Sequence, residues 1–256
     1  MEIERPAVRE WSWEQPAEDS RPNFGKLEPI DISPPYTRQR LGELGLSGLQ
    51  FAEWKSLHPG CLDTDIVGLV DGNGISTEPG RIYRLDGESY FVQLDARDPL
   101  PFADSCLDWV YAEHFIEHVS LADGIRWLTE VRRILAPGGL VRLTTPDLRR
   151  YAESYLSGDG GMFARHRDVL YERGARPRMP DRPAFMMNLV FSFWGHRWVY
   201  DFEELRFAFE QAGYPVDEIR RCSFGAGANG DVASMDRPHR RHETMYMEAS
   251  APAAAR

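Results

Sequence analysis

The chain alternates between short continuous apolar runs and longer stretches with helical spacing. Residues 107–111 and 140–143 are continuous apolar runs, which predict strands of a parallel sheet covered on both faces. Residues 90–94 predict a further strand that ends at Asp95. A helix is predicted over residues 121–135, because apolar side chains recur there every three or four positions: Ile125, Leu128, Val131, Ile134 and Leu135. Strands that alternate with helices predict a doubly wound α/β sheet.

The first part of the chain gives weaker signals. Residues 1–35 are rich in Pro, Glu and Trp and show no regular period, which predicts an extended arm, or disorder as the simpler alternative. Residues 38–54 indicate a short helical region interrupted by glycines. From Lys55 the pattern predicts a first strand, a turn at Gly60 and a second strand over residues 66–70 that ends at Asp71.

The second half of the chain continues the same alternation. Residues 148–200 predict a polar, partly helical insertion that caps the sheet. A helix is expected over residues 202–212, where Gly213 ends it. Two late strands follow, and residues 75–89 form an earlier insertion or hairpin. We therefore expect an N-terminal arm with lead-in helices over residues 1–54 and one α/β domain over residues 55–256.

Composition excludes several classes of function. The 256 residues carry a net charge of −10, which argues against a nucleic-acid or membrane-surface binder. The apolar runs are too short to span a bilayer, and the start lacks the apolar core of a secretory signal. Three scattered cysteines indicate a reducing cytoplasm rather than a disulfide framework, and no cysteine–histidine cluster points to a metal. We expect a cytoplasmic protein without a resident metal.

Three motifs in a fixed order point to one family. They are LDARDPLPFADSCLDWVYAEHFIEH at residues 94–118, LTEVRRILAPGGLVRLTTPD at 128–147, and WGHRWVYDFEEL at 194–205. Together they resemble the class I S-adenosylmethionine-dependent methyltransferases, in a type 11-like branch that acts on small molecules. The resemblance covers about residues 55–248 and leaves the first 50 or so residues unexplained.

The resemblance implies a Rossmann-like, seven-stranded sheet with S-adenosylmethionine across the carboxyl ends of its first strands. Gly60 matches the turn at the cofactor's methionine portion. Asp71 matches the acid that binds the ribose hydroxyls. Asp95 matches the acid at the adenine amino group, with Ala96 donating its backbone N–H. Two further residues, Tyr111 and Glu113, are expected to form the floor under the sulfonium.

The turn at Gly60 departs from the family pattern and keeps three hypotheses open. Leu62 stands where the family has a second glycine, and Pro59 lacks an N–H. The first hypothesis is a methyltransferase acting on a small molecule in natural-product biosynthesis. The second is a fold relative that catalyses cyclisation or elimination of an anionic small molecule without S-adenosylmethionine, which a crowded turn favours. The third is a non-catalytic subunit, and a homo-oligomer or a small partner protein is also conceivable.

Histidines and one acid are the candidate catalytic groups. His114 and His196 are candidates for the base that removes the acceptor proton. Asp147 follows a strand end and either orients a substrate amine or caps the next helix. His114 and His118 also match the HxxEH zinc motif of a protease class, but only a helical context would support that match. The family resemblance instead gives Glu117 and His118 a structural role.

Aromatic and basic residues are the candidates for substrate binding. Trp194, Trp198 and Tyr200 lie in an aromatic segment that forms either a substrate wall or part of the packing of the cap. Arg178 belongs to an arginine-rich stretch, which is either a solvated helical face or a site for an anionic group of the substrate. The expected partner is a small molecule.

Overall fold

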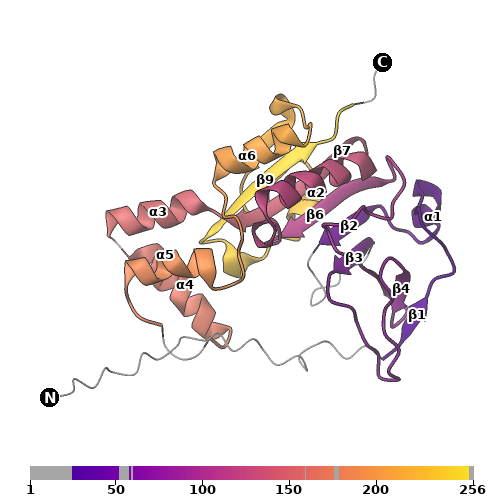
Figure 1. Ribbon diagram of the computed structural model, residues 1–256, viewed down its shortest axis with the longest axis horizontal. Coiled ribbons are helices and arrows are strands. Elements are labelled where there is room, and N and C mark those ends of the chain that lie inside the picture. The colour runs from indigo at the N-terminus through magenta and orange to yellow at the C-terminus, as the bar shows by residue number, and fades with distance from the viewer. Residues whose placement is uncertain (1–24, 52–57, 59, 159, 176–178, 254–256) are drawn as a thin grey trace.

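The computed structural model describes residues 25–51, 58, 60–158, 160–175 and 179–253, and within them it forms one nine-stranded sheet (Figure 1). The strand order is β1-β4-β5-β3-β2-β6-β7-β9-β8. The strands are β1 (Leu27–Pro29), β2 (Gly48–Phe51), β3 (Cys61–Asp65), β4 (Ile82–Leu85), β5 (Ser89–Gln93), β6 (Leu107–Glu113), β7 (Leu135–Pro146), β8 (Ile219–Cys222) and β9 (Thr244–Ser250). The doubly wound α/β prediction is confirmed, with nine strands instead of the expected seven.

The core of the sheet is parallel, and both of its edges carry antiparallel strands. Strands β5, β3, β2, β6 and β7 run parallel to their neighbours, while β9 is antiparallel to both β7 and β8. Strands β4 and β1 extend the other edge as an antiparallel addition to β5. The expected hairpin near residues 75–89 is therefore the β4–β5 pair. The carboxyl ends of five parallel strands meet at one edge of the sheet, where ligands of open α/β sheets bind.

Two helices cover one face of the sheet. Helix α2 (Leu121–Ile134) begins at Ser120, whose hydroxyl accepts from the Asp123 N–H, and it ends where β7 begins. Its apolar stripe packs with that of α6 (Phe202–Gln211) in the main core. The two helices lie side by side in Figure 1. The predicted helices over residues 121–135 and 202–212 are thus confirmed within one or two residues.

Three helices form the expected cap. They are α3 (Leu148–Ser157), α4 (Gly161–Glu172) and α5 (Pro183–Ser192), which share a small apolar core of their own. In Figure 1 they lie together beside the end of the sheet. The shortest helices are α1 (Arg38–Glu43) and α7 (Gly230–Ala233). Near α7, Val232 and Met235 pack on Tyr111, on the opposite side of β6 from the main core.

The first two parallel strands lie earlier in the chain than the sequence predicts. The first parallel strand is β2, inside the segment expected to be lead-in helices, and the second is β3. Gly48 pairs with Trp109 of β6, and a Cβ atom at Gly48 would lie 2.0 Å from the indole ring. The Trp109 indole ring therefore packs over β2 at a position where only glycine leaves room for it. The boundary expected after residue 54 does not hold, because β2 lies in the middle of the sheet.

Within the described residues, no helix is long and apolar enough to cross a membrane.

Candidate active site

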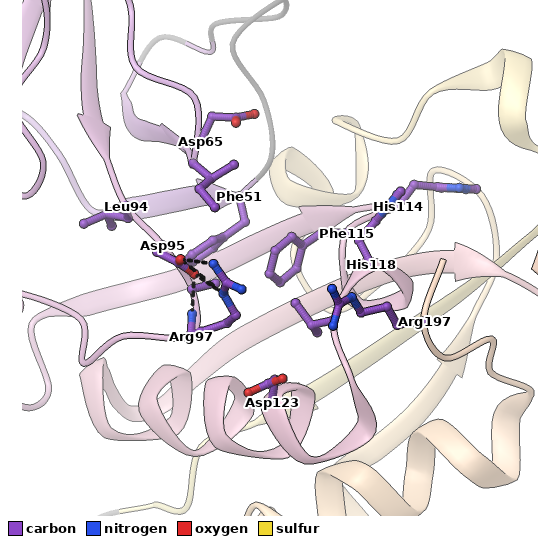
Figure 2. A pocket seen from close by; sticks show the side chains of 13 residues that line it. Phe51, Asp65, Leu94, Asp95, Arg97, His114, Phe115, His118, Asp123 and Arg197 are labelled. Atoms are coloured by element: carbon purple, nitrogen blue, oxygen red, sulfur yellow. Dashed lines mark hydrogen bonds and ion pairs between the residues drawn. The ribbon is translucent and has the colours of Figure 1, made fainter. Parts of the chain in front are cut away.

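A pocket of about 490 Å³ opens at the carboxyl ends of β2, β3, β5 and β6 (Figure 2). Its volume lies within the range of small-molecule sites. The chain reverses its winding direction at this point, since β3 and β6 lie on opposite sides of β2. The lining residues are Phe51, Asp65, Ile66, Leu94, Asp95, Ala96, Arg97, His114, Phe115, His118, Val119, Asp123 and Arg197.

One end of the pocket is acidic. Asp65 ends β3, and its Oδ1 accepts from the Val67 N–H at 2.8 Å. Burial raises the pKa of Asp65. Asp95 follows β5 and is bound by the Arg97 guanidinium, whose Nε lies 2.9 Å from Oδ1, so the pKa of Asp95 is lowered. Both acids face one pocket from neighbouring strands, and Ala96 lines it beside them.

Asp71 and Gly60 do not lie at this pocket. The Asp71 carboxylate accepts N–H groups from Leu27, Asn73 and Ile75, so it holds a turn together. Gly60 precedes β3 with a φ of +84°, and therefore turns the chain into the second parallel strand rather than out of the first. Asp65 occupies the strand-end position that the sequence analysis assigns to Asp71.

Leu62 lies inside β3 and is fully buried in the main core. It pairs in register with Leu49 and Tyr90, so it belongs to the sheet and not to a cofactor turn. The expected crowding by Leu62 is therefore wrong. Pro59 lies outside the described residues.

The other end of the pocket carries histidines (Figure 2). His114 follows β6 in a left-handed conformation with a φ of +48°. Its Nε2 lies 2.8 Å from the Thr244 hydroxyl, which itself donates to the Arg240 carbonyl, so Nε2 is the donor. Its Nδ1 lies 3.3 Å from Glu117 Oε1. Both ring nitrogens of His114 thus face groups of the protein.

His118 and His196 form a pair beside His114. Their rings meet edge to face at 4.8 Å between centroids, and His118 lines the pocket. His196 Nδ1 lies 2.5 Å from the Val190 carbonyl, so this nitrogen carries a proton and donates it to the carbonyl. Burial lowers the pKa of His118, so its imidazole is neutral at pH 7.

The HxxEH match lacks the context that a zinc protease needs. His114 precedes the 3₁₀ turn of Ile116–His118, so the two histidines do not share an α-helix. Glu117 is fully buried, and its Oε2 accepts from the Thr145 hydroxyl. Its backbone carbonyl accepts from the N–H groups of Arg197 and Trp198. Glu117 thus ties the end of β6 to the GHRW segment, as the structural alternative predicts.

Stability should fall in mild acid because of His114. Burial lowers the pKa of His114 well below 6.5, so the unfolded chain takes up a proton near pH 6.5 while the folded chain resists it. The contribution of neutral His114 to the free energy of unfolding is therefore fully present above about pH 6.5. Below that pH it is lost, by up to about 1.4 kcal/mol per pH unit for one such group. Urea unfolding at pH 7.5 and 5.5 should show a smaller loss for His114→Gln than for the wild type. Equal losses would contradict this assignment.

Tyr111 and Glu113 point away from the pocket. The Tyr111 hydroxyl lies 3.4 Å from Asp236 Oδ1. Glu113 accepts from the Arg237 backbone N–H and pairs with its guanidinium at 2.9 Å, while burial raises the pKa of Glu113 to about 7. The prediction that Tyr111 and Glu113 form the floor of the cofactor site is therefore wrong. His114 and Phe115, the next two residues along the chain, line the pocket instead.

Asp147 is the N-cap of α3, which confirms the helix-capping alternative. Its Oδ1 accepts from the Arg149 N–H, and its Oδ2 lies 2.7 Å from the Arg221 guanidinium. Asp147 is fully buried and does not line the pocket. Its two carboxylate oxygens therefore already have partners within the protein.

The expected substrate wall is spread over the cap and core. Trp194 packs in the cap core beside Phe193, and Trp198 donates to Glu204. Tyr200 is buried in the main core. None of the three tryptophan or tyrosine side chains lines the pocket, whereas Arg197 between them does. Arg178 lies outside the described residues.

Sequence reasoning missed Phe51, Asp65 and Phe115, and it gave His118 only a structural role. The signal for Asp65 is the run CLDTD, an alternation that ends in an acid. The signal for Phe51 is the short run GLQF, whose four residues are too few to show a period. Pairing with β6 on one side and β3 on the other is what identifies this run as a strand.

Residues 74–143 match a family model described as "Methyltransferase domain". The matched segment contains β4, β5, β6, α2 and most of β7, and it includes Asp95 and the histidine end of the pocket. The match confirms the recognition made from the three motifs, and with it S-adenosylmethionine as the cofactor that this family uses.

The solved structures that the chain resembles are distant from it. A chain of the complex that contains the Haloferax volcanii Trm112 methyltransferase activator is 17% identical, with 83% of this chain and 84% of that chain covered and a TM-score of 0.42. S-adenosylmethionine-dependent methyltransferases from Mesorhizobium loti and Archaeoglobus fulgidus are 15% and 12% identical, with TM-scores of 0.39 and 0.40. They cover 80% and 83% of this chain, and 91% and 92% of their own chains. No curated protein matches the chain.

Proposed function

Since the chain carries a methyltransferase domain of the S-adenosylmethionine-dependent type over residues 74–143, we propose that it transfers a methyl group to a small molecule in the pocket at the strand ends. The observation that carries this proposal is that a single pocket has two chemically different ends. Asp65 and Asp95 stand at one end, and His118 stands at the other (Figure 2).

The acidic end fits the adenosine part of the cofactor. A carboxylate at Asp65 can accept hydrogen bonds from both hydroxyls of a ribose, because its two oxygens match a vicinal diol. Asp95 and the Ala96 backbone, one strand further along, can accept from and donate to an adenine edge. Phe51, Leu94 and Phe115 supply apolar walls between these polar groups, as expected of a nucleoside site. When bound, S-adenosylmethionine supplies a methyl group that its sulfonium makes electrophilic.

The histidine end is suited to accepting the proton of the methyl acceptor. S-adenosylmethionine held there would supply the methyl carbon, and its sulfur would keep the electron pair of the carbon–sulfur bond that breaks as the acceptor bonds to that carbon. The acceptor's proton then passes to His118, which is neutral at pH 7 and lines the pocket. His196 packs edge to face against His118 and is held by the bond from its Nδ1 to the Val190 carbonyl. His114, whose Nε2 donates to the Thr244 hydroxyl, positions this wall.

The size and surroundings of the pocket favour a small acceptor. The pocket's 490 Å³ must hold the cofactor together with the acceptor or the part of it that reacts. Arg197 lines the histidine end and is exposed, so an acceptor with an anionic group is favoured there. Natural-product biosynthesis is the setting that we propose for such an acceptor.

The main argument for the second hypothesis, cyclisation or elimination without S-adenosylmethionine, no longer holds. It depended on Leu62 crowding the cofactor's methionine end, and Leu62 lies in the core of β3. Asp65 adds an acid at the end of the second parallel strand, as a nucleoside cofactor requires. No observation in the described residues favours cyclisation over methyl transfer.

Calorimetric titration of S-adenosylmethionine and S-adenosylhomocysteine into the purified protein tests this function. We expect one site per chain with micromolar affinity for both. An acceptor screen with methyl-labelled cofactor then tests transfer, and anionic small molecules should be the better acceptors. If neither compound binds at millimolar concentration while the protein is folded by circular dichroism, the proposed function is wrong.

A further inference from the structure

Two histidines and one acid gather behind the pocket wall, outside the site described above. His166 comes from α4 of the cap, while His242 and Glu243 directly precede β9. His166 Nδ1 lies 2.9 Å from His242 Nε2 and 3.4 Å from Glu243 Oε2. All three donor atoms lie within 4.8 Å of one another. Because 76 positions separate His166 from His242, the sequence contains no local metal motif at this place.

The charge of Glu243 is not matched by a basic side chain. Several other buried acids have an arginine at ion-pair distance: Asp236 and Glu248 pair with Arg142, and Asp147 pairs with Arg221. Glu117 is buried without one and faces His114 instead. For Glu243, the described part of the chain places only His166 at that distance, and Arg240 acts on it from further away. A buried carboxylate is costly unless a cation accompanies it.

At least one of the two histidines is uncharged. The 2.9 Å contact between His166 Nδ1 and His242 Nε2 joins two ring nitrogens, so one of them is an unprotonated acceptor. The Tyr151 hydroxyl donates to Glu243 Oε2 at 2.5 Å, but it is uncharged. Two facing imidazoles beside a buried carboxylate are a donor set of the kind that binds a divalent transition metal.

Two of the three distances between the donor atoms match one metal centre. Bonds of 2.0–2.1 Å to zinc place neighbouring donors about 3.3 Å apart in a tetrahedron and about 2.9 Å apart at right angles. The observed 2.9 and 3.4 Å lie at these two values, and all three donor atoms lie within 4.8 Å of one another. The Tyr151 hydroxyl holds Glu243 at 2.5 Å, which is a supporting contact of the kind that metal ligands usually have.

We propose that His166, His242 and Glu243 bind a divalent transition-metal ion of the zinc class. Three protein ligands leave a further position for water. The metal joins α4 of the cap to the segment before β9, next to Thr244, whose hydroxyl bonds His114 of the pocket. It therefore holds the cap at the histidine end of the pocket. This assignment is independent of methyl transfer.

Metal titration of the purified protein, stripped with a chelator, tests the assignment. We expect Co²⁺ to bind at one equivalent per chain with visible d–d absorption, and Zn²⁺ to displace it. His166→Gln should weaken Co²⁺ binding by at least about 100-fold, since losing even an outer partner of a ligand costs roughly 10- to 100-fold. Zn²⁺ should also raise the unfolding temperature of the wild type and not that of His166→Gln.

The matched control is His118→Gln. His118, His196 and Glu117 form the other described group with metal-ligating side chains, so this variant distinguishes the two places. We expect His118→Gln to keep the Co²⁺ spectrum. Absence of stoichiometric binding to the folded wild type would overturn the assignment and leave His166 and His242 as a simple hydrogen-bonded pair. Loss of the spectrum in His118→Gln, with retention in His166→Gln, would overturn it as well.

Discussion

Replacing Asp65 with asparagine is expected to weaken S-adenosylmethionine binding by roughly 10- to 100-fold, because a hydrogen bond to a charged group contributes about 1.5–3 kcal/mol. The substitution keeps the shape of the side chain at the end of β3 and removes its charge. An amide offers one accepting oxygen in place of two, so it satisfies only one hydroxyl of a ribose. Calorimetric titration of S-adenosylhomocysteine measures the loss without requiring a known acceptor.

The matched control for Asp65 is Asp71→Asn. Asp71 also follows an apolar run, six positions further along, and sequence reasoning alone favours it as the ribose ligand. In the structure its carboxylate accepts two backbone N–H groups of a turn and that of Leu27 in β1, and it does not line the pocket. We therefore expect Asp71→Asn to lower the unfolding temperature and to leave the cofactor dissociation constant unchanged. The reverse pattern would show that the pocket has been assigned to the wrong acid.

Replacing Arg142 with methionine is expected to lower the free energy of unfolding by about 3–5 kcal/mol, because it leaves two buried carboxylates without a cation. Arg142 is fully buried, and its guanidinium lies 2.6 Å from Asp236 and 2.7 Å from Glu248. It also donates to the carbonyls of Ser223 and Ala226. The residue therefore fastens the segment between β8 and β9 to the sheet. Urea unfolding monitored by circular dichroism measures the change.

Arg149→Met is the matched control for Arg142. Arg149 pairs with Glu153 one turn along α3, but both side chains are more than 60% exposed. Solvent screens such a pair, so we expect the free energy of unfolding to stay nearly the same. A triple variant, Arg142→Met with Asp236→Asn and Glu248→Gln, should recover part of the stability, because the buried charges are removed together. A small loss for Arg142→Met alone would mean that water reaches the carboxylates.

Much of the fold was predictable because several elements carry their own signals. The apolar stripe of α2 and the continuous run of β6 follow from local spacing, and both are confirmed. Strand β2 was missed because its four residues carry no period and follow a helical stretch. Its assignment comes from the hydrogen bonds to β3 and β6, which are distant in sequence.

The candidate site was only partly predictable. Asp95, Ala96 and His114 were predicted from the family motifs and do line the pocket. Tyr111 and Glu113 lie on the other side of β6, because successive side chains of a strand point to opposite faces. The sequence of such a motif therefore does not determine which of its residues faces the ligand. That depends on how the strand pairs within the sheet.

The sequence by itself determined the α/β class of the fold, most of its helices and strands, and the order of motifs that resembles a methyltransferase domain, which a family model matches over residues 74–143. These follow from local periodicity and from short motifs, which depend on neighbours along the chain. The tertiary structure alone decided which of the acids, Asp65 or Asp71, reaches the pocket, and that His166 meets His242 and Glu243. These depend on strand pairing and on the docking of the cap, which bring together residues whose spacing in the sequence carries no signal.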